Sequence, residues 1–422
     1  MTGFDFLLQS RKLGMKLGLE NMERLAKALG SPEKKLKFIH IAGTNGKGST
    51  AAFCAQALQE AGYRTGLFTS PHLISITERI QINGVPIPEE QITAIINEIA
   101  ELTRAWDHPP TFFEIITATA LKYFETEKVE WIVWETGLGG RLDSTNIVTP
   151  EVSILTQIDY DHQEFLGDTL FKIAHEKAGI IKEGIPTVCG VKDPEALLAI
   201  RERAKKQSSL LIETAELQWV DLGIKGKKQH LEIEGIPFQL SLLGKHQIQN
   251  ALTAFTALFA VLKIPVKSIQ RGFSKTHWPG RFQIIRENPL FVVDGAHNPS
   301  SMKQLIETWK TFCGETKATI VFGVMADKSY PLMVDPIESI AEKIILLKPN
   351  HPRAAEPSVI SALFRNILPE VHNDLSSLWK ELQTTKKPIL LTGSLFLVGE
   401  ALQLHQPASV TPMPQLNELL KP

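Results

Sequence analysis

The segment Gly43–Thr50 constrains the fold of this chain more than any other. It reads GTNGKGST and lies between an apolar run at Leu36–Ala42, which predicts a buried strand, and a helical pattern that begins at Ser49. Small residues in such a loop let backbone amides curl around phosphate oxygens, and the following helix N-terminus adds partial positive charge. The strand before the loop and the helix after it are the context that a phosphate-binding loop requires. The sequence therefore predicts a nucleotide site in an α/β fold; the alternative is a Gly-rich turn with an incidental lysine.

The loop departs from the strict Walker pattern in two places. Ile41 stands where that pattern has its first glycine, and Gly48 separates Lys47 from Ser49. Lys47 is expected to neutralise the β- and γ-phosphates of ATP, and the Ser49 hydroxyl is placed for a phosphate or a Mg²⁺ ion. Gly46, Lys47, Gly48 and Ser49 are therefore predicted to bind ATP.

Short apolar runs alternate with longer helical patterns through the first two-thirds of the chain. Strands are predicted at 36–42, 129–134, 152–156 and 185–189, and helices at 49–61, 89–105, 113–127, 168–178 and 193–206. This alternation predicts a doubly wound parallel sheet. Residues 209–243 look instead like antiparallel hairpins, and helices are expected after them at 246–262 and 266–273.

The pattern changes at Trp278-Pro279-Gly280, where proline and glycine favour a domain boundary. Beyond it, strands are expected at 290–293, 318–322, 343–347 and 388–392, with helices between them. This part predicts a smaller, Rossmann-like α/β domain. We therefore predict an ATP-binding domain over residues 1–280 and a C-terminal α/β domain over residues 281–422, whose final dozen residues form a loose tail.

Composition argues against several classes of protein. The 422 residues carry 45 basic and 46 acidic side chains, a formal net charge of −1, and nucleic-acid binding is not expected without a basic excess. Three widely spaced cysteines suit neither a disulfide framework nor a zinc site. No apolar run has the length of a signal-peptide core or of a membrane span. We expect a cytoplasmic protein with no membrane partner.

Ten motifs in order along the chain resemble those of the folylpolyglutamate synthase/dihydrofolate synthase family of the Mur-type ligases, in particular its bifunctional bacterial members. Gly48 in the phosphate loop is typical of this branch. The motifs are AGTNGKGST at 42–50, SPHL at 70–73, ERIQING at 78–84, TFFE at 111–114, ETGLGGRLDSTN at 135–146, DHQEFLGDT at 161–169, EKAGIIK at 176–182, HQIQNA at 246–251, WPGRF at 278–282 and DGAHNP at 294–299.

Glu135 is the first candidate metal ligand. It ends an apolar strand and precedes a Gly-rich turn, at the sheet edge where doubly wound folds bind ligands. A carboxylate beside a triphosphate is a natural Mg²⁺ ligand. The resemblance implies that Ser70, Glu135 and His162 coordinate two magnesium ions, and that Lys177 is carbamylated and assists the second ion. On residue chemistry alone, a lone histidine is more often structural and Lys177 is a solvated helix lysine.

The resemblance completes the ATP site with three residues outside the loop, namely Asn250, Arg281 and Asp294. Asn250 lies in an Ala-rich helix, where an amide is an ordinary surface residue unless it faces the cleft. Arg281 follows the expected domain boundary, where a guanidinium can reach phosphates as the domains close. Asp294 ends the first strand of the second domain, again at a carboxyl edge. Closure of the two domains over ATP is therefore expected.

The resemblance also implies the reaction. A substrate carboxylate attacks the γ-phosphate of ATP to give an acyl phosphate and ADP, and the amino group of L-glutamate then displaces phosphate to form an amide. No nucleophilic side chain is required, so catalysis is expected to rest on positioning and charge neutralisation. The predicted catalytic residues are Lys47, Lys177 and His297. The expected small-molecule partners are ATP, two Mg²⁺ ions, L-glutamate and dihydropteroate or a folate, and the expected oligomeric state is a monomer.

The acid-binding residues are carried over from the bifunctional bacterial members. Phe113 is able to stack on a flat ring, although a phenylalanine that opens an apolar helix is more often part of a core. The segment Lys16-Leu17-Gly18 also matches the pterin site, but Asn21 stands where the family has an arginine. The predicted folate-binding residues are Thr111, Phe113, Leu142 and Asp143.

Three alternatives stay open at this point. A monofunctional folylpolyglutamate synthase would share nearly all of these motifs. A Mur peptidoglycan ligase would carry a domain for its UDP-sugar precursor before the phosphate loop, and the roughly 35 residues before the first strand are too few for one. A non-catalytic nucleotide-binding regulator would not need Glu135, His162 and Lys177 together.

Overall fold

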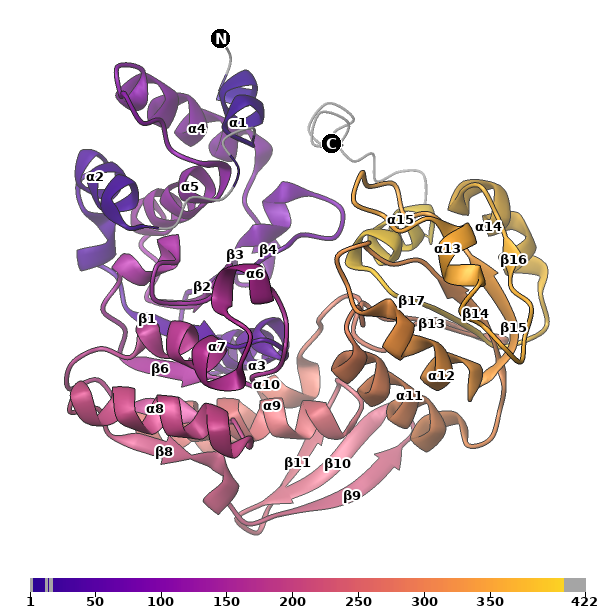
Figure 1. The fold of residues 1–422 in the computed structure, drawn as a ribbon. Coiled ribbons are helices and arrows are strands. Elements are labelled where there is room, and N and C mark those ends of the chain that lie inside the picture. The colour runs from indigo at the N-terminus through magenta and orange to yellow at the C-terminus, as the bar shows by residue number, and fades with distance from the viewer. Residues whose placement is uncertain (1–2, 12–13, 15–17, 406–422) are drawn as a thin grey trace.

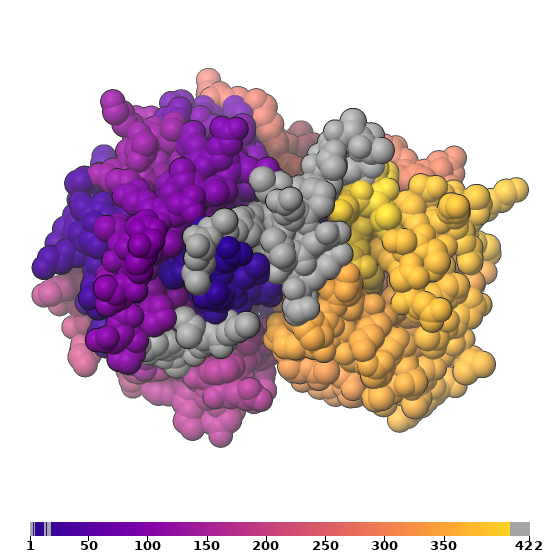
Figure 2. All heavy atoms as spheres, turned by 90° about the horizontal axis from the view of Figure 1, so that it is seen from above, coloured from indigo at the N-terminus to yellow at the C-terminus, as the bar shows by residue number. Residues whose placement is uncertain are grey.

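The computed structural model describes residues 3–11, 14 and 18–405. Two α/β bodies lie side by side, and a small antiparallel sheet runs beneath both of them (Figure 1). Figure 2 shows the same two bodies from above. Residues 406–422, which include the predicted tail, and the matched residues Lys16 and Leu17 lie outside the described part.

The first body contains an eight-stranded sheet with the order β4-β3-β2-β5-β1-β6-β7-β8. The six strands from β2 to β8 in this order are parallel, and β3 and β4 add an antiparallel edge. The predicted doubly wound parallel sheet is thus confirmed. Its strands are β1 (Phe38–Ala42), β2 (Thr65–Phe68), β3 (Ile80–Ile82), β4 (Val85–Pro86), β5 (Trp131–Glu135), β6 (Val152–Leu155), β7 (Thr187–Cys189) and β8 (Leu211–Glu213).

Helices cover both faces of this sheet because its central strands are buried on both sides. Along β5, Val133 packs into one core with α3, α9 and α10, whereas Ile132 and Trp134 pack into another with α2, α4 and α5. A third core lies under α7 and α8. The helices of this body are α1 (Gly3–Arg11), α2 (Glu20–Ala28), α3 (Lys47–Glu60), α4 (Glu89–Thr103), α5 (Phe112–Thr126), α6 (Gln163–Leu166), α7 (Leu170–Lys177), α8 (Pro194–Lys206), α9 (Lys245–Phe255) and α10 (Val266–Lys275).

The segment 209–243 differs in part from the predicted hairpins. Strands β9 (Trp219–Lys225), β10 (Lys228–Ile233) and β11 (Ile236–Leu240) form the expected antiparallel sheet, with Leu231 and Phe238 pointing into the first core. Residues Leu211–Glu213, however, form β8 and pair in parallel with β7. A three-residue strand carries too little pattern to reveal its partner, so tertiary packing decided its pairing.

The second body contains a six-stranded sheet with the order β12-β13-β17-β14-β15-β16, parallel except for β12. Its strands are β12 (Gln283–Glu287), β13 (Leu290–Val293), β14 (Ala318–Phe322), β15 (Ala341–Leu346), β16 (Glu370–Val371) and β17 (Ile389–Thr392). Helices α11 (Pro299–Cys313), α12 (Val334–Glu338) and α13 (Pro357–Ser361) cover one face, and α14 (Leu375–Thr384) and α15 (Leu395–His405) cover the other. The predicted Rossmann-like second unit is confirmed, whereas its boundary at residue 280 stays a prediction.

The carboxyl ends of three neighbouring strands, β2, β5 and β1, carry the candidate site at one edge of the large sheet. Strand β1 leads into the phosphate loop, β5 ends on Glu135, and β2 is followed closely by Ser70. The order β2-β5-β1-β6 places these three features side by side, facing the second body. In the described part of the chain, no helix has the length and apolar character that crossing a membrane requires.

Candidate active site

One cavity of about 460 Å³ opens above this edge, and both bodies contribute to its wall. Every residue that the sequence predicted for the site lines it, although the role of each stays a prediction. These residues are Gly46, Lys47, Gly48, Ser49, Ser70, Thr111, Phe113, Glu135, Leu142, Asp143, His162, Lys177, Asn250, Arg281, Asp294 and His297.

Close neighbours leave no room for a side chain at three glycines of the phosphate loop. A Cβ on Gly43 would lie 1.8 Å from the Thr156 hydroxyl, and one on Gly46, whose φ is +87°, would lie 2.2 Å from the Asn250 side-chain oxygen. A Cβ on Gly48 would lie 2.9 Å from the Trp278 indole. Gly48, the residue that breaks the Walker spacing, is therefore the surface on which the tryptophan of WPGRF packs.

Two lysine amines share one carbonyl at the base of this loop. Lys47 Nζ donates to the Gly43 oxygen at 3.0 Å, and Lys177 Nζ donates to the same oxygen at 2.9 Å. Burial, and then the positive charge of Lys47, lower the pKa of Lys177 to about 7. Lys177 is thus buried against the loop and holds a substantial neutral fraction near neutral pH. The interpretation as a solvated helix lysine is wrong.

Glu135 lies buried at the end of β5. Its Oε2 accepts a hydrogen bond of 3.1 Å from the backbone N–H of Ser70. Burial raises the pKa of Glu135 to about 7, against the opposing charges of Lys47 and Arg281. A carboxyl that is so costly to ionise is typical of a group that meets a cation during function.

His162 lies apart from Glu135 on a loop before α6, in a left-handed conformation with φ of +51°. Its side chain is 41% exposed, its Nε2 lies 3.9 Å from Asp161 Oδ2, and burial lowers its pKa. The neutral ring is therefore available as a ligand at neutral pH. Among the described residues, no three His, Cys, Asp or Glu side chains gather closely enough to form a metal-binding cluster by themselves.

Side-chain hydrogen bonds connect helix α9 to helix α3. Asn250 donates to Gln247 at 3.0 Å, and Gln247 Nε2 donates to the Ser49 hydroxyl at 3.3 Å. Asn250 is buried beside Gly46, so it faces the cleft and is not an ordinary surface amide.

The second body presents a polar turn between β13 and α11. Asp294 is buried and accepts hydrogen bonds from the backbone N–H groups of Phe282 at 2.7 Å and Ala296 at 2.8 Å, and burial raises its pKa. His297 Nδ1 lies 2.8 Å from the Gly295 carbonyl, which fixes Nδ1 as the protonated nitrogen. Burial, followed by the charge of Lys328, lowers the pKa of His297 to about 4, so its ring is neutral.

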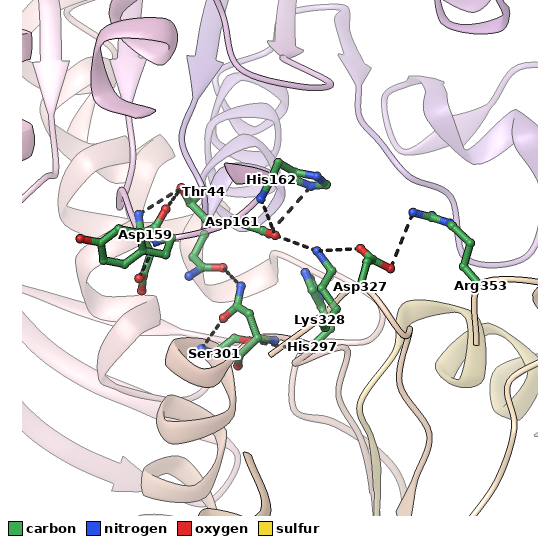
Figure 3. A network of polar contacts seen from close by, with 12 residues as sticks. Thr44, Asp159, Asp161, His162, His297, Ser301, Asp327, Lys328 and Arg353 are labelled. Atoms are coloured by element: carbon green, nitrogen blue, oxygen red, sulfur yellow. Dashed lines mark hydrogen bonds and ion pairs between the residues drawn. The ribbon is translucent and has the colours of Figure 1, made fainter. Parts of the chain in front are cut away.

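Figure 3 shows how the two bodies meet beside these residues. Asn298 donates to Asn45 in the phosphate loop at 3.1 Å, and Lys328 pairs with Asp161 at 2.8 Å. The Lys328 and Asp161 side chains are only 11% and 15% exposed, so this ion pair is largely shielded from solvent. Asp327, which lies between Lys328 and Arg353, extends the network to the protein surface.

The acid-binding candidates form the opposite wall. Thr111 caps α5 through its reciprocal hydrogen bonds with Glu114, at 3.4 and 2.7 Å. The Phe113 ring lies so close to Gly137 that a Cβ there would be 2.5 Å away, so the ring covers the turn after β5. Asp143 is buried, accepts a hydrogen bond from Leu138 N–H at 2.7 Å, and has a pKa raised by burial.

Comparison with known proteins agrees with this geometry. Residues 41–258 match the Mur ligase middle domain, and residues 280–395 match the Mur ligase, glutamate ligase domain. The dihydrofolate synthase/folylpolyglutamate synthase of Bacillus subtilis is 38% identical over 412 residues, which cover 92% of this chain and 95% of that protein. The Escherichia coli protein of the same name is 34% identical and covers 80% of this chain and 79% of its own length. The chain belongs to the dihydrofolate synthase/folylpolyglutamate synthase family.

Solved structures of this family share the whole fold. Folylpolyglutamate synthase from Thermotoga maritima superposes with a TM-score of 0.85 at 32% identity and covers 98% of both chains. The Escherichia coli FolC complex with DHPP and ADP has a TM-score of 0.84 at 29% identity and covers 96% of this chain and 97% of that one. The family resemblance that the motifs suggested is therefore confirmed.

Sequence reasoning missed several residues that line the cavity or the seam between the bodies. Arg79 and Asp161 belong to the motifs ERIQING and DHQEFLGDT, so the family resemblance was a signal that both residues matter. Lys328 lies in no recognised motif, and nothing in its local sequence indicates that it pairs with Asp161, which is 167 residues away.

Proposed function

We propose that this protein is an ATP-dependent ligase that joins L-glutamate to dihydropteroate and to folates through an acyl phosphate. One observation carries the proposal. A single cavity brings together the phosphate loop with its two lysines, the buried Glu135 carboxylate and the wall formed by Thr111, Phe113 and Asp143. Relatives with this fold are named for both activities, and one was solved with DHPP and ADP.

The reaction follows from which groups surround the cavity. An oxygen of the substrate carboxylate attacks the γ-phosphorus of ATP, the bond to ADP breaks, and an acyl phosphate forms. The glutamate amine then attacks the acyl carbon, loses a proton, and inorganic phosphate leaves as the amide forms. Lys47 and Arg281, one from each body, neutralise the phosphate charge, and the buried seam excludes water from the acyl phosphate.

The donor set around Glu135 fits Mg²⁺. Glu135 is buried with one hydrogen bond, from Ser70 N–H, and in the described part of the chain it makes no ion pair. Mg²⁺ takes one or two carboxylates together with waters and substrate phosphates, so a cluster of three acidic side chains is not required. Ser70 and Glu135 would hold one ion, and His162 with Lys177 the second. When bound, the ions neutralise the phosphates and orient the attacked phosphoryl group.

Lys177 has the chemistry that carbamylation requires. Its neutral amine attacks CO₂, a C–N bond forms, one proton leaves, and a carbamate anion replaces an ammonium. The pKa of about 7 makes the neutral amine abundant at neutral pH. The exchange also removes the repulsion between two ammonium groups that now share the Gly43 carbonyl.

A monofunctional folylpolyglutamate synthase is the second candidate. Asn21, which replaces the family arginine, favours it, and a relative named folylpolyglutamate synthase alone, from Lacticaseibacillus casei, is 33% identical. The buried Asp143 carboxyl and the Phe113 ring suit the pterin ring of either acid, and the relatives named for both activities favour bifunctionality. The domain division at residue 280, the monomeric state and the cytoplasmic location stay predictions.

A substrate panel tests the proposal. Phosphate release is measured with dihydropteroate, tetrahydrofolate or tetrahydrofolyl-diglutamate, each with ATP and with or without L-glutamate; UDP-linked peptides serve as the control for a Mur-type substrate. Release that requires L-glutamate and occurs both with dihydropteroate and with tetrahydrofolate supports the bifunctional proposal. Release with tetrahydrofolate and L-glutamate, but not with dihydropteroate, supports the monofunctional candidate. Release only with UDP-linked peptides contradicts both.

A further inference from the structure

Arg79 is a buried cation in the cavity that the reaction described above does not use. Its backbone oxygen accepts a hydrogen bond from Thr69 N–H at 3.0 Å, which holds it beside Ser70 at the end of β2. The side chain is 9% exposed and lines the cavity. Its Nε donates to His72 Nδ1 at 2.9 Å, and its guanidinium carbon lies 5.6 Å from the centre of the Phe112 ring.

The two terminal nitrogens of Arg79 remain available to a ligand. Among the described residues, neither makes a hydrogen bond to protein, and no carboxylate lies within ion-pair distance of the guanidinium. The adjacent Glu78 is already occupied, because its carboxylate accepts the backbone N–H groups of residues 73–75. Glu135 and Glu78 act on Arg79 electrostatically, but neither forms an ion pair with it. A buried guanidinium without a paired anion is costly, and its fork of two N–H groups matches a carboxylate.

Its place in the cavity narrows the choice of anion. Arg79 lies between the aromatic entry of α5, marked by Phe112, and the metal side, marked by Ser70 and Glu135. The charges that act on Lys177 are those of Lys47, Asp161 and Asp143, whereas the charge of Arg79 acts on Glu135. The free donors of Arg79 therefore lie between the Phe112 ring and the Glu135 end of the cavity.

We propose that Arg79 binds the non-reacting α-carboxylate of the terminal glutamyl unit of a folate substrate. This inference rests on the proposed function. In a folate the γ-carboxyl reacts, and the α-carboxylate is attached between it and the ring, so it would meet a cation placed between Phe112 and Glu135. In dihydropteroate the reacting carboxyl is attached directly to the ring, and no second carboxylate exists. Arg79 is thus a specificity-determining residue for glutamylated acids.

A cycle of enzyme and substrate variants tests this contact. Wild type and Arg79→Gln are each assayed with tetrahydrofolate and with its analogue in which a carboxamide replaces the α-carboxylate, and kcat/KM is measured for all four pairs. The wild type is expected to prefer the carboxylate by about 10- to 100-fold, as for other hydrogen bonds to charged groups, mainly through KM. Arg79→Gln is expected to discriminate less than threefold. A residue that only supports the fold would lower both rates equally.

The controls separate folding from recognition. Arg64→Gln removes an exposed arginine just before β2, at the end of that strand away from Arg79, and is expected to keep the wild-type preference. Arg79→Lys keeps the charge without the fork; if Arg79→Gln does not fold, a preference reduced at least threefold in Arg79→Lys supports the proposal, and an unchanged preference overturns it.

Each remaining outcome also has a meaning. Equal preference in wild type and Arg79→Gln overturns the inference and leaves the ligase proposal intact. A wild type that glutamylates dihydropteroate and not tetrahydrofolate overturns the Arg79 role as well. No amide from either acid overturns the proposed function, and the inference with it.

Discussion

Replacing Glu135 by glutamine is expected to stabilise the protein and to inactivate it. The pKa of the Glu135 carboxyl rises from its ordinary value of 4.5 to about 7 because the group is buried. Each pKa unit is worth 1.36 kcal/mol, so holding this group ionised costs the folded state about 3 kcal/mol. Glutamine has the same shape and no charge, but its amide donors lack partners, at a cost of about 1 kcal/mol. The net gain at pH 8 is about 2 kcal/mol.

The stability difference between the wild type and Glu135→Gln depends on pH. A carboxyl whose pKa is higher in the folded state than in the unfolded state binds more protons when folded between pH 4.5 and about 7. Stability of the wild type is therefore lost as pH rises through this window, and the full cost is present at pH 8. Glu135→Gln has no titratable group at this position, so its stability does not fall through this window. The two proteins should differ most at pH 8 and little at pH 5.

Thermal unfolding in EDTA at pH 5 and pH 8 measures the effect. A gain of about 2 kcal/mol corresponds to a rise in Tm of about 4 °C for a unit of this size. Mg²⁺ and ATP should then raise the Tm of the wild type and leave that of Glu135→Gln nearly unchanged, and the variant should lose turnover. Glu151→Gln, which changes an exposed carboxylate just before β6, is the matched control. A metal-free Glu135→Gln that is less stable than the wild type at pH 8, or one that keeps its activity, would refute this reasoning.

Three further outcomes follow from the same site. Lys47→Ala should lower turnover by about 1,000-fold or more through lost phosphate neutralisation, whereas Lys172→Ala, on an exposed ion pair, should not; near-normal turnover in Lys47→Ala rules out the loop assignment. Asp143→Ala should raise KM for dihydropteroate by about tenfold, as for a lost hydrogen bond to a charged group, and leave KM for ATP nearly unchanged; equal losses contradict its place in the acid site. Protein equilibrated with ¹³C-bicarbonate at pH 8 should show a carbamate carbon by NMR that Lys177→Ala lacks, and an identical spectrum in both proteins contradicts carbamylation.

The strands that feed the site were predictable because their patterns are local. Continuous apolar runs around Ile39 and Val133 indicate strands buried on both faces, and the polar residues that end such runs must emerge at the sheet edge. The phosphate loop and Glu135 followed from this rule.

What the sequence did not reveal depends on distant packing. The pKa of Lys177 is set by burial against a loop 134 residues away. The pair formed by Lys328 and Asp161 comes from two separate bodies. Arg79 ends a single 3-10 turn just before the three-residue strand β3, which is too short to carry a pattern, so its place in the cavity appears only once β3 pairs with β2. Family resemblance supplied roles for many residues, but not the physical reason for any of them.

The central claim is that the acid is activated by phosphorylation. Dihydropteroate whose carboxylate carries ¹⁸O tests it directly, with ATP, Mg²⁺ and L-glutamate, by mass spectrometry of the released phosphate. The oxygen that attacks the γ-phosphorus stays with phosphate when the amide forms, so one ¹⁸O should appear in inorganic phosphate for each amide made from fully labelled acid. Amide formation with unlabelled phosphate would contradict the account.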